Sequence, residues 1–182
     1  DLGAGFLIVN LLGVTILREI GPLLAAILNA GRSGSSMTAH IGVMRVTKEL
    51  DAMAVLGISA PLRLVLPRVL GQMIALPLIV LWTDALAIVG GIVGAKVQLG
   101  ITWHQFAHRL PQVVPLTSLW FGVCKGVAFG ALIALIACYF GLRIRPDTDG
   151  LATGTTQSVV TALTLVLLAD AILAIVFAHL RL

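Results

Sequence analysis

Four long apolar stretches constrain this chain more than any other feature of its sequence. They run from Leu2 to Ala30, Val65 to Val97, Leu116 to Leu142 and Thr156 to Leu180. Each is longer than the ~20 apolar residues that an α-helix needs to cross a bilayer core. Because backbone groups in lipid must be satisfied internally, such spans are helical. We therefore expect an all-α, polytopic membrane protein with about four transmembrane helices.

Composition supports this class and excludes others. Of the 182 residues, 59% are hydrophobic and only 11% are charged, whereas soluble domains carry about 25% charged residues. An ordinary soluble enzyme and a disordered chain are both excluded. The net charge of +4 is thinly spread and accompanied by a single Tyr, so we expect no nucleic-acid partner.

The Lys and Arg residues predict the orientation of the spans, because cytoplasmic loops are enriched in them. We expect the segments 31–64, 98–115 and 143–155 to connect the spans. Seven basic residues lie in or beside the first and third connections, and three lie on the other side. The seven are Arg32, Arg45, Lys48, Arg63, Arg68, Arg143 and Arg145, and the three are Lys96, Arg109 and Arg181. The first and third connections are therefore predicted to be cytoplasmic.

Five ionisable residues fall inside the apolar stretches, where a charge costs a few kcal/mol or more unless it is paired or hydrated. They are Arg18, Glu19, Asp84, Lys125 and Asp170. We expect them to face the interior of the helix bundle, with Glu19 and Asp170 as the natural partners of Lys125. Such a network is either structural or the polar lining of a substrate cavity, and the two interpretations are compatible.

Small residues recur every four positions in the third stretch, which is typical of closely packed membrane helices. The candidate helix-packing residues are Gly90 and Gly94 in the second stretch and Gly122, Gly126 and Gly130 in the third. The pattern in the third stretch continues with Ala134 and Cys138. A static packing surface and a surface that slides during transport both fit this pattern.

The segment 46–57 is predicted to form a short amphipathic helix. Its apolar positions share one face at helical spacing, and Lys48, Glu49 and Asp51 lie away from that face. Gly57 is a typical C-terminal stop. Such a helix at the cytoplasmic surface either caps the bundle or is gripped by a soluble partner.

Three runs in the first half of the chain resemble the MlaE (YrbE-like) permease family. They are 17–24 (LREIGPLL), 30–36 (AGRSGSS) and 41–53 (IGVMRVTKELDAM), and the resemblance resumes at Lys125 and from Thr155 to Asp170. These permeases are membrane subunits of MCE-type ABC transporters that move phospholipids or other lipids across the periplasm. Members carry helices upstream of the point where this chain begins, so we expect an N-terminally truncated single permease domain over 1–182.

The resemblance implies a role for each part of the chain. The helix over 46–57 would be the coupling helix, with ATPase contacts at Thr47, Lys48, Glu49, Asp51 and Met53. Two permeases would pair about a two-fold axis in a bacterial inner membrane, with lipid in the cavity between them. A periplasmic MCE-domain protein would be a partner, and a STAS-domain protein an optional further one.

No G-x-x-x-x-G-K-[ST] sequence occurs in the chain, and this motif is the one that cradles nucleotide phosphates. We therefore expect a transport subunit that is not an enzyme and binds no cofactor, with ATP and Mg on the partner ATPase.

An ion-coupled secondary transporter or channel is the alternative function, with Asp84, Lys125 and Asp170 as its relay. An intramembrane serine protease using Ser33 is disfavoured, because the predicted topology places His104, His108 and His179 at the opposite face.

A metal site at His104 and His108 is disfavoured as well, since no suitable third ligand stands nearby. A disulfide between Cys124 and Cys138 is excluded, because 14 positions on one helix separate them by about 21 Å.

Overall fold

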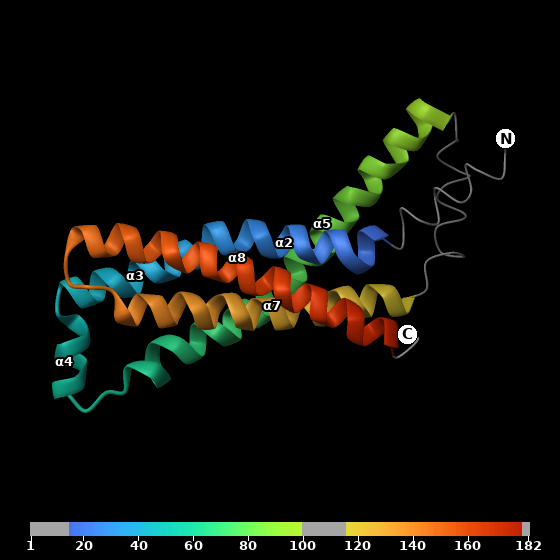
Figure 1. Cartoon of the computed structure of the whole chain (residues 1–182). Helices are drawn as coiled ribbons and strands as arrows, with labels where there is room; N and C mark the ends of the chain where they lie inside the picture. Colours follow the sequence, from blue (N-terminus) through green and yellow to red (C-terminus); the bar gives the residue numbers. More distant parts are fainter. Residues whose placement is uncertain (1–14, 100–115, 180–182) are drawn as a thin grey trace.

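The computed structural model describes residues 15–99 and 116–179, and every regular element in these two stretches is a helix (Figure 1). A first helical stretch runs through η1 (Ile16–Ile20), α2 (Gly21–Asn29), η2 (Ala30–Gly34) and α3 (Ser35–Val46). The short α4 (Glu49–Val55) and η3 (Pro61–Val65) follow, and then the long helices α5 (Leu66–Leu99), α7 (Leu116–Arg143) and α8 (Thr148–His179). The all-α prediction is confirmed.

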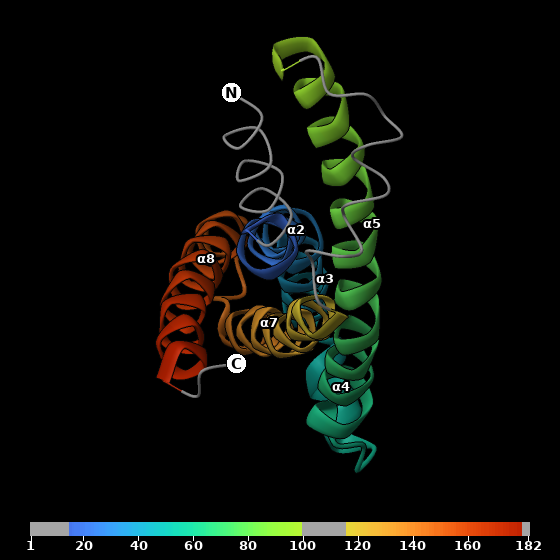
Figure 2. The same ribbon diagram turned by 90° about the vertical axis from the view of Figure 1, so that its right-hand side faces the viewer.

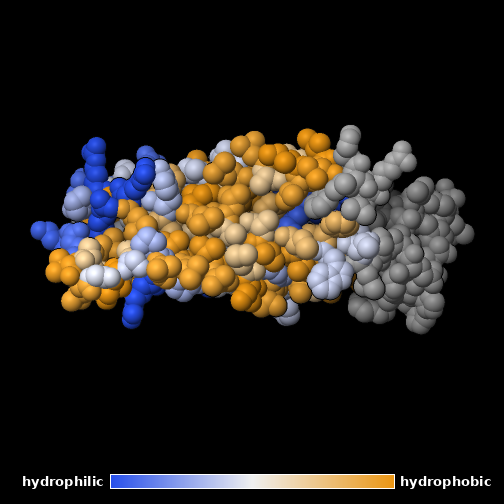
Figure 3. Space-filling view, turned by 90° about the horizontal axis from the view of Figure 1, so that it is seen from below, coloured by the Kyte–Doolittle hydropathy of each residue, from blue (hydrophilic) through white to orange (hydrophobic). Residues whose placement is uncertain are grey.

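Three helices in the described residues are long and apolar enough to cross a membrane: Pro61–Gly94, Thr117–Arg143 and Thr148–Val176. They correspond to the second, third and fourth predicted spans. The first predicted span begins at Leu2, and only its part from residue 15 onward is described. Figure 3 shows an apolar band across the middle of the molecule, with hydrophilic side chains gathered at one end.

The segment 31–64 was expected to be a connection between two spans, but its first part is helical. The helix continues without a break past residue 31 to Val46, and its later part, α3, packs against α7 and α8. Two of its polar side chains donate to carbonyls of the same helix. The Ser35 hydroxyl donates to the Arg32 carbonyl at 3.0 Å, and Thr38 Oγ1 donates to the Gly34 carbonyl at 3.1 Å.

The amphipathic helix is also shorter than predicted. Val46 ends α3, and Lys48 adopts a left-handed conformation with φ 60° before α4 begins at Glu49. This conformation changes the direction of the chain. Gly57, with φ +72°, stands two residues after the end of α4, where glycine adopts a positive φ without a Cβ penalty.

Helix α7 lies at the centre of the bundle. Figure 2 shows it between α8 and α5, and it also contacts α2 and α3. The apolar core forms where these helices meet, at Ala26, Ala30, Leu76, Phe129, Ile133, Ala162 and Val166. Many other apolar side chains point outward, such as Trp82 at 69% exposed and Ile175 at 69% exposed. An outward-facing apolar surface is what a lipid environment favours.

Three glycines of α7 let neighbouring backbones approach closely. A Cβ on Gly122 would lie 2.6 Å from the Leu17 carbonyl oxygen, and one on Gly130 would lie 2.6 Å from the Gln72 carbonyl oxygen. A Cβ on Gly126 would lie 3.2 Å from Pro77 Cα. The glycine stripe of α7 is thus the surface on which η1 and α5 pack.

The expected packing at Gly90 and Gly94 is not made within the described chain. A Cβ at either position would meet no atom within 4 Å. Figure 1 shows the reason, because the C-terminal part of α5 extends away from the other helices.

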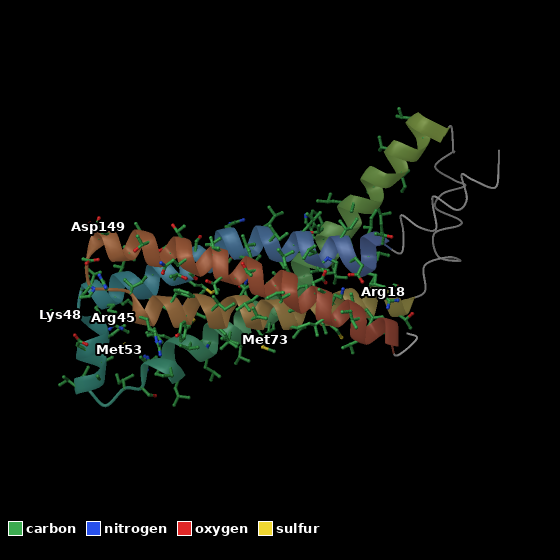
Figure 4. The ribbon with its side chains drawn as sticks, in the orientation of Figure 1. Arg18, Arg45, Lys48, Met53, Met73 and Asp149 are labelled. Carbon is green, nitrogen blue, oxygen red and sulfur yellow. The ribbon has the colours of Figure 1, made fainter. Side chains whose placement is uncertain are left out.

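The α3–α4 and α7–α8 connections lie at the same end of the molecule. Arg45 donates a hydrogen bond to the Leu142 carbonyl across this end. Figure 4 places Arg45, Lys48, Met53 and Asp149 here and Arg18 at the opposite end. The arrangement agrees with the predicted topology, which puts both connections on one side of the membrane. We call this end, which carries Arg45, Lys48, Arg143 and Arg145, the basic end.

Candidate functional site

A buried lysine joins three helical segments of the bundle. Lys125 in α7 is 1% exposed, and its Nζ donates to Glu19 Oε2 at 2.7 Å and to Asp170 Oδ1 at 2.9 Å. Glu19 comes from η1 and Asp170 from α8. The structure therefore brings together the lysine and both of the partners expected from the sequence. We call these three residues the ionic cluster.

The three side chains of the ionic cluster differ in their exposure to solvent. The Glu19 side chain is 36% exposed and that of Asp170 is 15% exposed, whereas the Lys125 side chain is 0% exposed. Because the Glu19 carboxylate is accessible, a polar ligand or water can contact the cluster there. The local geometry of η1, a single π-helical turn, is common at functional sites.

Arg18 and Asp84 lie near the cluster but make different contacts. The Arg18 guanidinium lies over the Phe121 ring, 5.5 Å from its centroid. Asp84 in α5 is 3% exposed and sits against Gly21, where a Cβ would collide with Asp84 Oδ1. That oxygen has no hydrogen-bond partner among the described residues. No bond within the described chain links Asp84 to Lys125.

A layer of hydroxyl groups lies between the ionic cluster and the basic end, and sequence analysis missed it. Thr38 Oγ1 lies 2.7 Å from Ser158 Oγ and 3.1 Å from the Ala137 carbonyl oxygen. Thr38 is 0% exposed and Ser158 is 1% exposed. These contacts join α3, α7 and α8. The sequence shows a threonine and a serine within apolar helical segments. It does not show that they pair, because 120 positions separate them.

A second polar contact joins α3 to α5. Arg68 Nη2 lies 2.8 Å from His40 Nδ1. The interaction requires the histidine nitrogen to accept, because arginine is always a donor. This pair was not predicted from the sequence.

The predicted ATPase-contact residues cluster at the basic end. Thr47 Oγ1 bonds to the Val43 carbonyl at 3.1 Å and to Glu49 Oε1 at 3.0 Å, which fixes the start of α4. Lys48, Glu49 and Asp51 are exposed, and Met53 is half-buried. No residue of α4 is buried. The helix stands out from the bundle with its charges in solvent (Figure 4).

Exposed apolar residues follow directly on this helix. Val55 is 88% exposed and Leu56 is 74% exposed. The helix has acidic residues in its first turn and exposed apolar residues beyond its end, so it offers both the apolar centre and the polar rim of a docking surface. Such an element can transmit a rigid-body movement of a partner to α3 and α5, which flank it in the chain.

The remaining candidate residues form no further site in the described part of the chain. There, no group of three or more His, Cys, Asp or Glu residues is arranged to hold a metal ion. Cys124 is exposed and Cys138 is buried, and both are free thiols. His104 and His108 lie outside the described residues.

Comparison with known proteins identifies the relatives of this chain. The family described as "Permease MlaE" matches residues 1–176. The "Probable ABC transporter permease protein" of Rickettsia bellii is 32% identical over 157 residues, which cover 86% of this chain and 61% of that protein. The "Intermembrane phospholipid transport system permease protein MlaE" of Haemophilus influenzae is 32% identical over 168 residues, covering 90% of this chain and 63% of that protein.

A plant protein is also similar. The "Protein TRIGALACTOSYLDIACYLGLYCEROL 1, chloroplastic" of Arabidopsis thaliana is 30% identical over 179 residues, which cover 97% of this chain and 50% of that protein. The chain spans about three fifths of the length of the bacterial relatives that it matches.

Proposed function

Because this chain belongs to the MlaE permease family, we propose that it is the membrane-spanning subunit of an ABC transporter for phospholipid or a related lipid. The lipid moves between a bacterial inner membrane and a periplasmic MCE-domain protein, and a separate ATPase subunit drives the movement. The observation that carries the proposal is the match to the family over residues 1–176, together with the names of the Rickettsia and Haemophilus relatives.

The exposed α4 supports the ATPase partner. It is a charged helix outside the bundle, held at its start by the Thr47–Glu49 contact. ATP and Mg bind to the ATPase chain, and α4 with its flanking loops receives the movement that ATP binding produces there. The contact residues that we propose are Thr47, Lys48, Glu49, Asp51 and Met53.

The ionic cluster supports a polar region inside the helix bundle. Glu19, at 36% side-chain exposure, gives the cluster an accessible face. We propose that this face borders the lipid cavity, which forms between two copies of the permease about a two-fold axis. Arg18 belongs to the same end of the bundle and contributes a cation there. Asp84 lines the α2–α5 contact instead.

The experiment that tests this function is native mass spectrometry of the full-length protein, gently extracted from its own membrane. The expected result is an assembly with two permease copies, an ATPase and an MCE-domain protein, with lipid masses released on activation. A STAS-domain subunit would be an additional mass. A lone permease that never carries an ATPase, even after mild extraction, contradicts the proposal and favours the ion-coupled alternative.

Transport is tested by reconstitution of that assembly in vesicles that contain a fluorescent phospholipid. ATP is expected to drive exchange of the lipid with the MCE-domain protein, and a hydrolysis-deficient ATPase subunit is the matched control. Exchange that is equally fast without ATP, but follows an imposed proton gradient, contradicts an ATP-driven transporter.

A further inference from the structure

Two adjoining hollows lie at the basic end, between the end of α7 and the start of α8. The first has a volume of about 700 Å³, and its charged lining residues are Arg143, Arg145, Asp147 and Asp149. The second has a volume of about 560 Å³, and apolar side chains dominate its lining, with Leu135 and Leu165 among them. Tyr139 and Phe140 line both hollows, so a polar section continues directly into an apolar one.

The two hollows lie at different depths in the membrane. Arg143 is the last residue of α7, whereas Leu135 lies eight positions earlier, about 12 Å deeper along the helix axis. Tyr139 stands between them and is 51% exposed, as is typical of aromatic side chains at the membrane interface. The charged hollow is thus at the depth of lipid headgroups, and the apolar one is at the depth of acyl chains.

Tyr139, which lines both hollows, holds the Arg143 side chain in place. Arg143 Nη1 donates to Tyr139 Oη at 2.6 Å, and the guanidinium stacks on the same ring, 4.4 Å from its centroid. An arginine has five N–H donors, so this contact orients the group and uses only one of them. Basic pockets at this depth between membrane helices are suited to lipid phosphate groups.

The lining of the charged hollow contains both signs of charge. Arg143 and Arg145 are balanced by Asp147 and Asp149. Asp147 Oδ1 accepts from the Gly150 backbone N–H at the start of α8, which leaves Asp149 as the more available carboxylate. A purely anionic headgroup would find partners only at the arginines and would leave Asp149 without one. A headgroup that carries a phosphate and an ammonium group finds a partner for each.

We propose that this composite hollow binds one molecule of a zwitterionic phospholipid of the phosphatidylethanolamine class. Its phosphate lies at Arg143 and Arg145, its ammonium group lies at Asp149, and an acyl chain follows the groove past Leu135 and Leu165. The site is separate from the ionic cluster, because Lys125 lies 18 positions before Arg143 on α7, about 27 Å along the axis. The proposal requires only that the chain spans a membrane, and it does not depend on whether the chain transports lipid.

Site-specific photo-crosslinking tests the proposal. A benzophenone amino acid replaces Leu165 in the full-length protein, which is placed in nanodiscs of equal parts dioleoyl-phosphatidylethanolamine and dioleoyl-phosphatidylglycerol. The matched control carries the probe at Leu168, which is on the same helix, is 55% exposed and does not line the hollow. Mass spectrometry identifies the crosslinked partner at each position.

The Leu165 probe is expected to enrich phosphatidylethanolamine over phosphatidylglycerol about tenfold relative to the Leu168 probe, as one charge-assisted contact implies. Asp149→Asn should remove this preference, and Arg143→Gln with Arg145→Gln should lower total lipid crosslinking at Leu165. Arg63→Gln, an exposed arginine at the same end, should change neither quantity. A probe at Leu135 gives a second, independent readout.

Three results would overturn the proposal. One is the same lipid ratio at Leu165 and Leu168, which means that only bulk lipid reaches the groove. Another is crosslinking of Leu165 and Leu135 to a polypeptide, which assigns the groove to a protein partner. The third is stronger competition by inorganic phosphate than by glycerophosphoethanolamine, which means that the charged hollow binds phosphate alone and does not recognise a zwitterionic headgroup.

Discussion

At the scale of single residues, Lys125 is the point where the bundle depends most on charge. Its ammonium group is shielded from solvent and meets one carboxylate from η1 and one from α8. Removing the lysine leaves two neighbouring carboxylates without a counter-charge, of which that of Asp170 is largely shielded from solvent; breaking a fully buried pair costs about 3–5 kcal/mol. The tertiary position of two helices relative to α7 therefore rests partly on this one side chain.

A double-mutant cycle measures that dependence. Lys125→Met, which keeps the length of the side chain, should lower the free energy of unfolding by about 3 kcal/mol. Adding Asp170→Asn should recover part of the loss, because the buried carboxylate that lost its partner is then neutral. Thermal unfolding of the purified protein in detergent is the measurement. Strictly additive losses would show that the two residues do not interact.

At the scale of helices, the sequence predicted the long elements well and the polar ones poorly. The apolar stretch 116–142 became α7, Leu116–Arg143, because length and apolarity determine such a span. The segment 31–46 looked like a connection because it contains many polar residues. It is a helix packed against α7 and α8, where Thr38 pairs with Ser158. A local pattern does not contain the information that this partner exists.

The same limit applies to the candidate site. Lys125, Glu19 and Asp170 were predictable as a group, since a charge inside an apolar span requires a partner. Asp84 satisfied the same criterion, yet it packs against Gly21. The difference depends on how α5 crosses α2, which tertiary packing sets. The short helix α4 was predicted from the amphipathic spacing of residues 46–57. Its start at Glu49 follows the left-handed conformation of Lys48, which the spacing does not indicate.

Substitution of two glycines separates packing from helix propensity. Gly130→Ala places a Cβ 2.6 Å from the Gln72 carbonyl oxygen, so we expect a loss of about 1–3 kcal/mol from overpacking. Gly90→Ala meets no atom within 4 Å and gains up to about 1 kcal/mol of helix propensity. Melting temperatures should therefore move in opposite directions. A drop of similar size in both variants would contradict the assigned packing surface.

A charge reversal in α4, compared with a substitution at Lys125, tests whether ATPase docking and lipid transport depend on different parts of the chain. Glu49→Lys removes the contact from Thr47 Oγ1 and reverses an exposed charge, so we expect the ATPase subunit to dissociate first. Lys125→Ala acts far from α4 and should impair lipid exchange while the ATPase still co-purifies.

Affinity purification followed by quantification of each subunit is the measurement, with the exchange rate determined on the same samples. Equal loss of assembly in both variants would contradict the division.

At the scale of the whole molecule, the predicted orientation assigns each end to one side of the membrane. In a background with both native cysteines replaced, Asp51→Cys and Asp149→Cys should react with a membrane-impermeant maleimide only in inside-out vesicles. Lys96→Cys, at the far end of α5, should react only in right-side-out vesicles. All three positions are exposed in the isolated chain, so access to the reagent depends on the side of the membrane once the ATPase subunit has been stripped from the vesicles. Labelling of Asp51→Cys and Asp149→Cys from different sides would contradict the fold.

The ionic cluster also has a consequence for synthesis of the chain. Glu19 is followed by Lys125 only after 106 positions, and Asp170 comes another 45 positions later. At about 5–20 residues per second, the ribosome takes roughly 5–20 s to deliver the lysine after the glutamate. During that interval the lysine partner of Glu19 does not yet exist, so the ionic contact between η1 and α7 forms only after more than a hundred further residues have been made.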